Sequence, residues 1–202
     1  MGKVFSHMTM SLDGFIADPQ DGVAELFDWY QAGDVTVPSH APEYSFQVDP
    51  DSAAMLRGYL ENAAVIVCGR RLFDYTDGWG GQHPAADHVV VVTHRRPEDA
   101  DRWKTTTFTD SVEAGIAEAK RIARDAGDKD VTIASASIAA QALDLGLVDE
   151  VHVSLVPVLL GEGIPYFANL TRAPHRFEDP VVIQGTRATH LKYTVRTTTK
   201  DR

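Results

Sequence analysis

The sequence is poor in cysteine, and Cys68 is the only one among its 202 residues. A single cysteine excludes an intramolecular disulfide and makes a reducing compartment the natural location. Cys68 ends an apolar run, which is typical of a packed and unreactive thiol. The eight histidines are scattered, without a pair one helical turn apart or beside the cysteine, so we expect no metal site.

Long hydrophobic runs are also missing. No apolar stretch approaches the roughly 20 residues that a membrane-spanning helix requires. The segment from Met1 to Phe15 contains nothing like the apolar region of a secretory signal. We therefore expect a soluble, cytoplasmic protein without a membrane partner.

Positive charge is scarce as well, because 19 lysine and arginine residues stand against 29 aspartate and glutamate residues, for a formal net charge of -10. Such a chain repels nucleic acids and anionic membranes, so neither is an expected partner. With 44% hydrophobic and 24% charged residues, the composition is that of a globular protein. No repeat or linker divides the chain. We expect one domain over residues 1–202, with 19–50 as an insertion or a pocket loop.

What the sequence does contain is a regular succession of apolar patterns. Helical spacing and capping residues predict helices at Ala24 to Tyr30, Ser52 to Asn62, Arg70 to Tyr75, Ser111 to Ala126 and Ile138 to Leu147. Alternating or continuous apolar runs predict strands at Val4 to Ser11, Phe15 to Ala17, Ala63 to Val67, Val89 to Val92, Val131 to Ala134, Val151 to Val156, Val181 to Ile183 and Ala188 to Arg196. This order of βα units and an all-β tail predicts an α/β sandwich whose mixed sheet is parallel in the middle and antiparallel at one edge.

The most informative segment is Asp149 to Phe167, DEVHVSLVPVLLGEGIPYF. Its alternating strand is followed by Gly161 and Gly163, which allow a tight turn or a close approach to a ligand. Immediately upstream, small residues from Ala134 to Ser137 lie between a strand and a helix. Because α/β folds place phosphates at such a junction, the pattern favours an enzyme that uses a nucleotide cofactor.

Four segments in order resemble the dihydrofolate reductase superfamily. More closely, they resemble the reductase domain of bifunctional riboflavin-biosynthesis deaminase–reductases and its stand-alone bacterial relatives. The matching segments are Met8 to Ala17, Val67 to Phe73, Ser135 to Leu147 and Asp149 to Phe167. The resemblance implies a three-layer, dihydrofolate reductase-like sandwich and covers most of the chain except 19–50. The paired cysteines of a zinc deaminase are missing, so deamination is excluded.

The resemblance also implies NADPH as cofactor and suggests where it binds. The expected cofactor-binding residues lie in the loops that follow strands, and they are Gly14, Gly69, Arg70, Arg71, Thr93, Arg95, Ser135, Ala136, Ser137, Gly161 and Gly163. Arginine forks suit phosphate, and Thr93 and Arg95 follow the strand whose loop holds the adenosine 2′-phosphate in such folds. The alternative for each loop is an ordinary turn or a solvated pair of arginines.

Two positions depart from the family pattern. Leu72 stands where the family commonly has threonine, and Ser135 and Ala136 replace a glycine pair. Ser135 and Ser137 are expected instead to donate their hydroxyls and to cap the helix. The lost glycines leave open a non-catalytic member that binds a nucleotide or a partner, and a flavin- or deazaflavin-linked reductase is a further alternative.

The preferred function is an NADPH-dependent reductase that transfers hydride to a C=N or C=O bond of a small heterocyclic or sugar-bearing substrate. Proton-donor candidates are Asp13, beside the expected nicotinamide site, and Asp49 or Asp51, at the start of the helix that borders the pterin pocket in dihydrofolate reductase. A carboxylic acid in this role needs a pKa raised by burial, and an ordered water is the alternative.

The resemblance further implies a homodimer. The apolar run from Val151 to Leu160 gives physical support, because a strand edge left open there would invite aggregation. The alternative is that helix Ser111 to Ala126 and the C-terminal hairpin cover this run within one chain.

Overall fold

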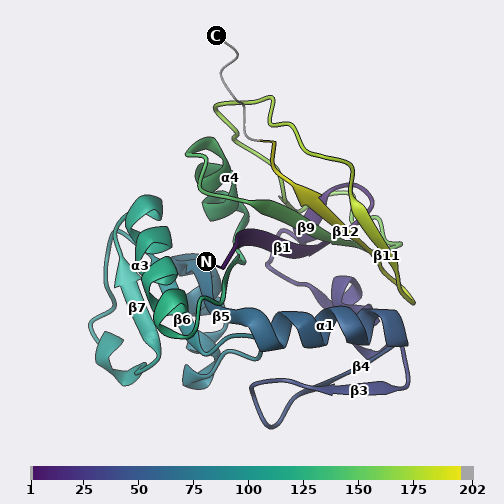
Figure 1. The fold of residues 1–202 in the computed structure, drawn as a ribbon, viewed down its shortest axis with the longest axis horizontal. Helices are drawn as coiled ribbons and strands as arrows, with labels where there is room; N and C mark the ends of the chain where they lie inside the picture. The colour runs from purple at the N-terminus through teal and green to yellow at the C-terminus, as the bar shows by residue number, and fades with distance from the viewer. Residues whose placement is uncertain (1, 197–202) are drawn as a thin grey trace.

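The computed structural model describes residues 2–196, and its centre is one twisted sheet (Figure 1). In spatial order the sheet contains β11 (Val181–Gln184), β12 (Thr189–Thr194), β9 (Glu150–Leu155), β1 (Val4–Met10), β8 (Asp130–Ile133), β5 (Ala63–Gly69), β6 (His88–Val92) and β7 (Thr106–Thr109). Strands β9 to β7 run parallel to one another, whereas β12 and β11 are antiparallel. The expected mixed sheet with an antiparallel C-terminal edge is confirmed.

Helices cover both faces of this sheet and give three layers. They are α1 (Pro50–Asn62), α2 (Arg70–Tyr75), α3 (Val112–Asp125) and α4 (Ala136–Asp144), with 3-10 segments η1 (Ala24–Gln31), η2 (Asp77–Gly81) and η3 (Ala100–Arg102). The buried residues of α3 and α4 pack against one face, where the main hydrophobic core lies. α1 and α2 lie on the other face, since Phe5 stacks on Tyr59 of α1 and Ile66 packs with Phe73 of α2.

Local chemistry explains why α1 forms where it does. Asp49 is the N-cap and accepts hydrogen bonds from the backbone N–H groups of Asp51 and Ser52, both at 3.0 Å. Pro50 occupies the first helical position, where its missing N–H has no intrahelical partner to lose. Met55 and Leu60 are among the side chains that the helix buries. The predicted helix is therefore confirmed, and it begins two residues earlier than the prediction.

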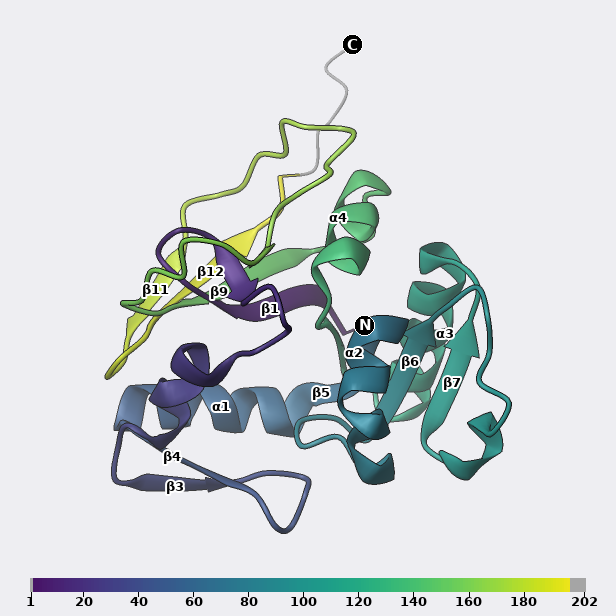
Figure 2. The ribbon, with the colours of Figure 1, turned by 180° about the vertical axis from the view of Figure 1, so that it is seen from behind.

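Residues 19–50 contain more regular structure than the sequence patterns predict. Besides η1, they form the antiparallel hairpin of β3 (Val35–Pro38) and β4 (Ser45–Val48), which lies beside α1 (Figures 1 and 2). Trp29 is only 1% exposed, and its indole N–H donates to the Thr9 hydroxyl at 3.1 Å. This segment therefore packs on the α1 side of the sheet and shares a second hydrophobic cluster with α1.

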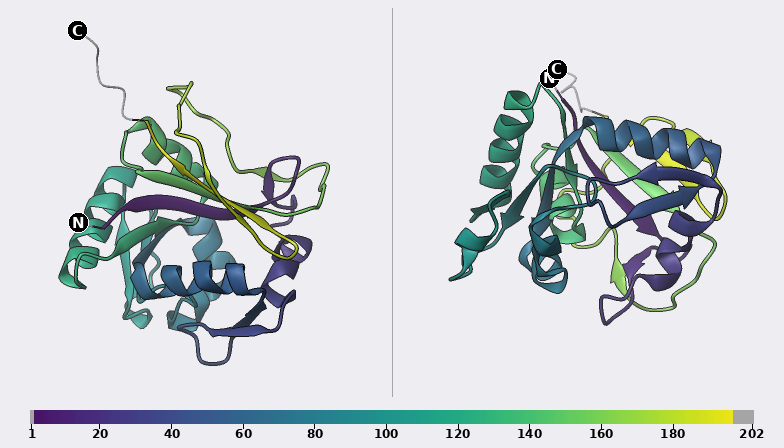
Figure 3. Two further views of the ribbon diagram at one scale, coloured as in Figure 1. Left: turned by 45° about the vertical axis from the view of Figure 1, so that its right-hand side comes forward. Right: turned by 90° about the horizontal axis from the view of Figure 1, so that it is seen from below.

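The open strand edge proposed for the run from Val151 to Leu160 is wrong. β9 is paired with β1 on one side and with β12 on the other (Figures 1 and 3). The C-terminal hairpin therefore supplies hydrogen-bond partners for the backbone groups on the second side of β9, within one chain. The sheet ends instead at β7 and β11, and in β11 the side chains of Val181 and Val182 are 62% and 58% exposed.

Candidate functional site

The candidate site lies where β1, β5, β6 and β8 end. Because these strands are parallel, the loops that follow them meet at one edge of the sheet. They are Ser11 to Gly14, Gly69 to Arg71, Thr93 to Arg95 and Ala134 to Ser137. Contacts between the loops show which predicted residues come together.

Ser135 joins two of these loops. Its hydroxyl oxygen accepts a hydrogen bond from the backbone N–H of Gly69 at 2.9 Å. The prediction that Ser135 caps the following helix with its side chain is wrong, because α4 has no side-chain cap. Ser137 is exposed in the first turn of α4, next to the half-buried Ala136. Ser135, which replaces a glycine of the family pattern, thus accepts the hydrogen bond that the Gly69 N–H would otherwise offer to an anion.

The predicted arginines have partners within the chain. Nε of Arg70 lies 2.6 Å from Oδ1 of Asp74, and its Nη1 donates to the carbonyl of Arg95 at 2.8 Å. Arg71 forms an ion pair with Asp21, at 2.8 Å, and Asp21 belongs to the 19–50 segment. Two of the arginines are therefore neutralised by carboxylates of this chain, and Arg70 also holds the loop that carries Arg95.

Arg95 differs from its neighbours in its charge environment. The Thr93 hydroxyl accepts a hydrogen bond from the backbone N–H of Arg95 at 3.3 Å and donates one to the backbone carbonyl of Arg95 at 3.1 Å. These two bonds fix the backbone of the loop. Arg96 is paired with Asp101 at 2.7 Å. Within residues 2–196, no carboxylate lies within ion-pair distance of the Arg95 guanidinium. Arg95 therefore presents an exposed positive charge that makes no ion pair with the described part of the chain.

Asp13 connects the turn after β1 with the glycine-containing loop after β9. Its carboxylate accepts from the backbone N–H of Gly161 at 2.7 Å and of Leu160 at 3.2 Å, and from the Ser11 hydroxyl at 2.6 Å. Gly14, Gly161 and Gly163 all have positive φ, at 91°, 79° and 154°. The structure thus brings the turn that carries Asp13, expected beside the nicotinamide, next to the loop that carries Gly161. The role of the Leu160 and Gly161 N–H groups was missed, because nothing local predicts which carboxylate they contact.

The electrostatics of Asp13 do not match the requirement for a proton donor. The hydrogen bond from Ser11 is the main cause that lowers the pKa of Asp13. Burial opposes it, but the N–H groups of Gly161 and Leu160 lower the pKa further, so that it lies below its ordinary value. The prediction required a pKa raised by burial. Asp13 is therefore an ionised acceptor that fixes a loop.

Asp49 and Asp51 lie at the N-terminus of α1. Besides capping α1, Asp49 accepts from the backbone N–H of Thr186, in the β11–β12 turn, at 2.8 Å. Burial raises the pKa of Asp49, but hydrogen bonds from Ser52, Thr186 and Asp51 outweigh it and leave the pKa below its ordinary value. Asp49 thus also lacks the raised pKa that the prediction required. Asp51 is exposed, and its N–H donates to Asp49.

A buried chain of hydrogen bonds begins at Asp49 and was missed by the sequence analysis. The Ser52 hydroxyl donates to Asp49 at 2.6 Å and lies 3.0 Å from Nε2 of His190. Nδ1 of His190 and Nε2 of His7 each lie 2.9 Å from the Ser154 hydroxyl. The alternation of polar and apolar residues along the strands is a weak sequence signal for this chain of hydrogen bonds. Only the pairing of β1, β9 and β12 places its residues side by side.

Among the described residues there is no group of three or more histidine, cysteine, aspartate or glutamate side chains that could hold a metal ion. No helix in residues 2–196 combines the length and apolar character needed to cross a membrane.

Comparison with known proteins decides the family. The model of the RibD C-terminal domain matches residues 2–175. The chain belongs to this family. A search of curated protein sequences found no match.

Solved structures share the fold at low sequence identity. A protein from Shewanella sp. PV-4 named for riboflavin biosynthesis is 21% identical, with a TM-score of 0.66 over 96% of this chain and 99% of that one. Dihydrofolate reductase from Enterococcus faecalis, complexed with NADP(H), is 14% identical, with a TM-score of 0.58 and coverages of 97% and 98%. A bifunctional deaminase/reductase from Thermotoga maritima is 11% identical, with a TM-score of 0.61, and the match covers 96% of this chain and 57% of that one.

The fold is therefore dihydrofolate reductase-like, as the sequence predicted. Membership of the RibD C-terminal domain family supports a reductase.

Proposed function

We propose that the protein is an NADPH-dependent reductase acting on a C=N or C=O bond of a small heterocyclic or sugar-bearing substrate. The proposal rests on the family and on the loops at the carboxyl ends of β1, β5, β6 and β8. Asp13, Gly14, Gly161 and Gly163 would lie at the nicotinamide, and the loops that carry Gly69 to Arg71, Thr93, Arg95 and Ser135 to Ser137 would hold the phosphates.

The residues present fit such a cofactor. At Gly14 and Gly161 no atom lies within 4 Å of the position that a Cβ would take, so the backbone is open to a close ligand. Leu12 and Leu159 are 57% and 70% exposed on the same loops, and they offer apolar surface for a ring. Asp13 holds these loops together through its bonds to Leu160 and Gly161.

Arg95 is the observation that carries the choice of NADPH over NADH. Its guanidinium is the one in the cluster Arg70, Arg71, Arg95 and Arg96 that makes no ion pair among residues 2–196. An unpaired arginine in an acidic chain attracts a dianionic 2′-phosphate and gains a charge-assisted hydrogen bond.

The cofactor, when bound, supplies the hydride, and the chain must position the acceptor and deliver a proton. Asp13 and Asp49 are poor acids because hydrogen bonds lower their pKa values. We therefore assign proton delivery to an ordered water, with Asp13 positioning the loop at which the substrate binds.

A second candidate function is the binding of a nucleotide or a partner without catalysis, on the same fold. The bond from the Gly69 N–H to Ser135 favours it, because this donor is no longer available to a phosphate. Tryptophan fluorescence and thermal unfolding in the presence of NADPH separate the candidates. Absence of both quenching and a thermal shift would remove the reductase.

The decisive experiment compares Arg95→Ala with Arg96→Ala. Loss of a charge-assisted phosphate contact weakens NADPH binding by about 10- to 100-fold. NADH binding should stay nearly unchanged in Arg95→Ala, and Arg96→Ala should bind both cofactors like the natural chain because Arg96 is already paired with Asp101. An equal loss for both cofactors in Arg95→Ala would show that Arg95 has only a structural role.

The remaining parts of the proposal follow the family resemblance. We propose that residues 1–202 act as one domain in the cytoplasm and assemble as a homodimer. The exposed sheet edge at β11, with Val181 and Val182, offers apolar surface and unpaired backbone groups to a second copy.

A further inference from the structure

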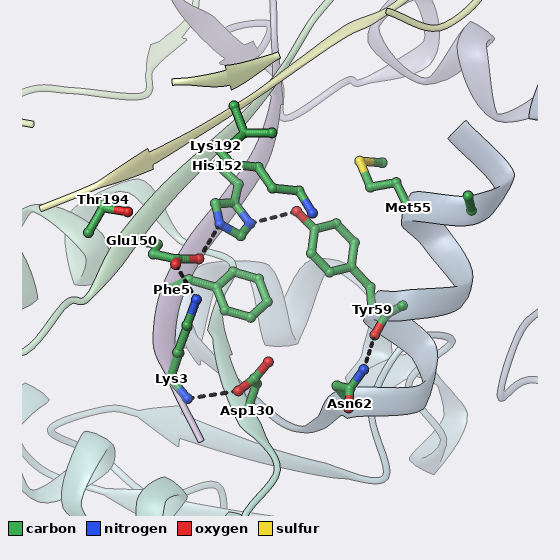
Figure 4. A pocket seen from close by; sticks show the side chains of 13 residues that line it. Lys3, Phe5, Met55, Tyr59, Asn62, Asp130, Glu150, His152, Lys192 and Thr194 are labelled. Carbon is green, nitrogen blue, oxygen red and sulfur yellow. Dashed lines mark hydrogen bonds and ion pairs between the residues drawn. The ribbon is translucent and has the colours of Figure 1, made fainter. Parts of the chain in front are cut away.

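A pocket of about 450 Å³ lies at the amino ends of the parallel strands, opposite the candidate cofactor site (Figure 4). It lies between the C-terminal half of α1 and the sheet, and it is bordered by β11 and β12. Its lining residues are Lys3, Phe5, Ala54, Met55, Gly58, Tyr59, Asn62, Asp130, Glu150, His152, Val181, Lys192 and Thr194. The volume is in the range of pockets that take small organic molecules.

The pocket has a rigid aromatic wall. The rings of Phe5, Tyr59 and His152 stack nearly in parallel, with centroid distances of 4.6–5.7 Å. The Tyr59 hydroxyl lies 2.6 Å from Nδ1 of His152, whose Nε2 lies 2.8 Å from Glu150 (Figure 4). A histidine that accepts from Tyr59 and donates to Glu150 is neutral, consistent with burial lowering the pKa of His152 to about 4. These bonds hold the wall in place without a ligand.

The acidic groups of the pocket are already engaged. Glu150 bonds to His152 and to the Lys3 ammonium. Asp130 accepts from the backbone N–H of Lys3 at 2.7 Å. A cationic ligand would therefore have to compete with Lys3 for Glu150.

Lys192 is the unmatched charge of this pocket. Its ammonium lies 5.0 Å from the centroid of the Tyr59 ring, over the ring face (Figure 4). No carboxylate among residues 2–196 lies within ion-pair distance of it. The side chain is half-buried, and burial lowers the pKa of Lys192. Glu150 raises the pKa of Lys192 through its charge, but it bonds to Lys3 and His152 and forms no ion pair with Lys192. An anion next to this ammonium would therefore be its direct ion-pair partner.

We propose that this pocket binds a small organic acid, with its carboxylate or phosphate group on Lys192 and an apolar, ring-sized body against Tyr59, Phe5 and Met55. The apolar side chains select the body, and the ammonium of Lys192 selects the charge. This local charge has to outweigh the repulsion of anions by a chain with a net charge of -10. The pocket and the cofactor edge lie at opposite ends of the parallel strands, so the inference does not depend on the proposed reductase activity.

The test uses three probes that share one ring: benzoate, benzyl alcohol and benzylammonium. Each is titrated into the full ¹⁵N-labelled chain, and backbone amide shifts are followed by NMR. We expect benzoate to bind most tightly and to move the amides of Tyr59, Glu150 and Lys192. Lys192→Met, which keeps the length and apolar character of the stem, should weaken benzoate about tenfold and leave benzyl alcohol unchanged.

Lys104→Met is the matched control, because Lys104 is exposed and lies outside the pocket lining. Unchanged benzoate affinity in Lys104→Met would support the proposal. Equal binding of benzoate and benzyl alcohol, an unaffected affinity in Lys192→Met, or shifts confined to amides outside the pocket would each overturn it. Separate arms with benzoate and phenyl phosphate distinguish carboxylate from phosphate as the preferred anion.

Discussion

Replacement of Gly163 by alanine should be much more costly than the same change at Gly161, two residues earlier in the same loop. Gly163 has φ of +154°, and a Cβ added there would lie closer than 3.0 Å to the carbonyl oxygen of Ala17. That oxygen belongs to β2 (Phe15–Ala17), which pairs with β10 (Ile164–Pro165) directly after the glycine. The backbone oxygen cannot rotate away, so relief of the overlap requires β2 and β10 to separate.

The expected cost follows from two contributions. A non-glycine residue in such a sparsely populated conformation costs about 1–3 kcal/mol. Separation of the two strands forfeits one or two hydrogen bonds of roughly 1 kcal/mol each. We therefore expect Gly163→Ala to lower the free energy of unfolding by about 2–5 kcal/mol, and Gly163→Val to lower it further.

Gly161→Ala serves as the internal reference. Gly161 has φ of +79°, but nothing lies within 4 Å of the added Cβ. Only the backbone penalty of about 1–2 kcal/mol applies there. Glu162→Gln, at an exposed position between the two glycines, should change stability by less than about 0.5 kcal/mol.

Urea unfolding followed by tryptophan fluorescence measures these differences. If the free energy of unfolding falls by about 2 kcal/mol per molar urea, a difference of about 2 kcal/mol between the two alanine variants separates their urea midpoints by roughly 1 M. NADPH titration of the same variants reports whether the loop also serves the cofactor. Equal midpoints for Gly161→Ala and Gly163→Ala would refute the steric argument, and unchanged affinity in both would remove the loop from the cofactor site.

Three further predictions concern stability and assembly. Asp49→Ala should lower the free energy of unfolding by about 1–2 kcal/mol, because the cap of α1 and the acceptor for Thr186 are both lost. Asp49→Asn should retain most of the cap. Equal urea midpoints for the two variants would contradict this. Burial lowers the pKa values of His152 and His190 from 6.5 to about 4, so the unfolded chain binds more protons between these values. The free energy of unfolding should therefore fall as the pH drops from about 6.5 to about 4, by up to about 3 kcal/mol per histidine, and a flat urea midpoint across this range would argue against buried neutral histidines. Light scattering at micromolar concentration should give twice the chain mass of 22.1 kDa, and a mass equal to one chain would remove the proposed homodimer.

The sequence by itself determined the elements whose signals are local. The continuous apolar runs of β5 and β6 predict buried parallel strands, because a strand covered on both faces needs apolar residues at every position. The cap at Asp49 predicts the start of α1, because its side chain satisfies N–H groups within the next few residues, and the helical spacing of apolar residues predicts α3. Four ordered segments were enough to predict the family that the domain comparison confirms.

The shorter elements escaped prediction because their patterns are weak. β7 contains TTFT with half-buried residues throughout, and neither strict alternation nor a continuous apolar run marks it. The β3–β4 hairpin lies in a segment with many turn-forming residues, and its strands are only four residues long. Such strands are stabilised by the surface on which they pack, which the local sequence does not describe.

Only the tertiary structure decided which side chains meet. The pairing of Ser135 with Gly69, of Arg70 with the Arg95 loop, and of Asp13 with Gly161 joins residues between 25 and 148 positions apart. The structure also decided that Arg70 and Arg71 form ion pairs with carboxylates of this chain, whereas Lys192 forms none with residues 2–196. Helix and strand signals are local because they depend on neighbouring backbone and burial periodicity, whereas contacts between loops depend on strand order and register, which the packing of the whole chain selects.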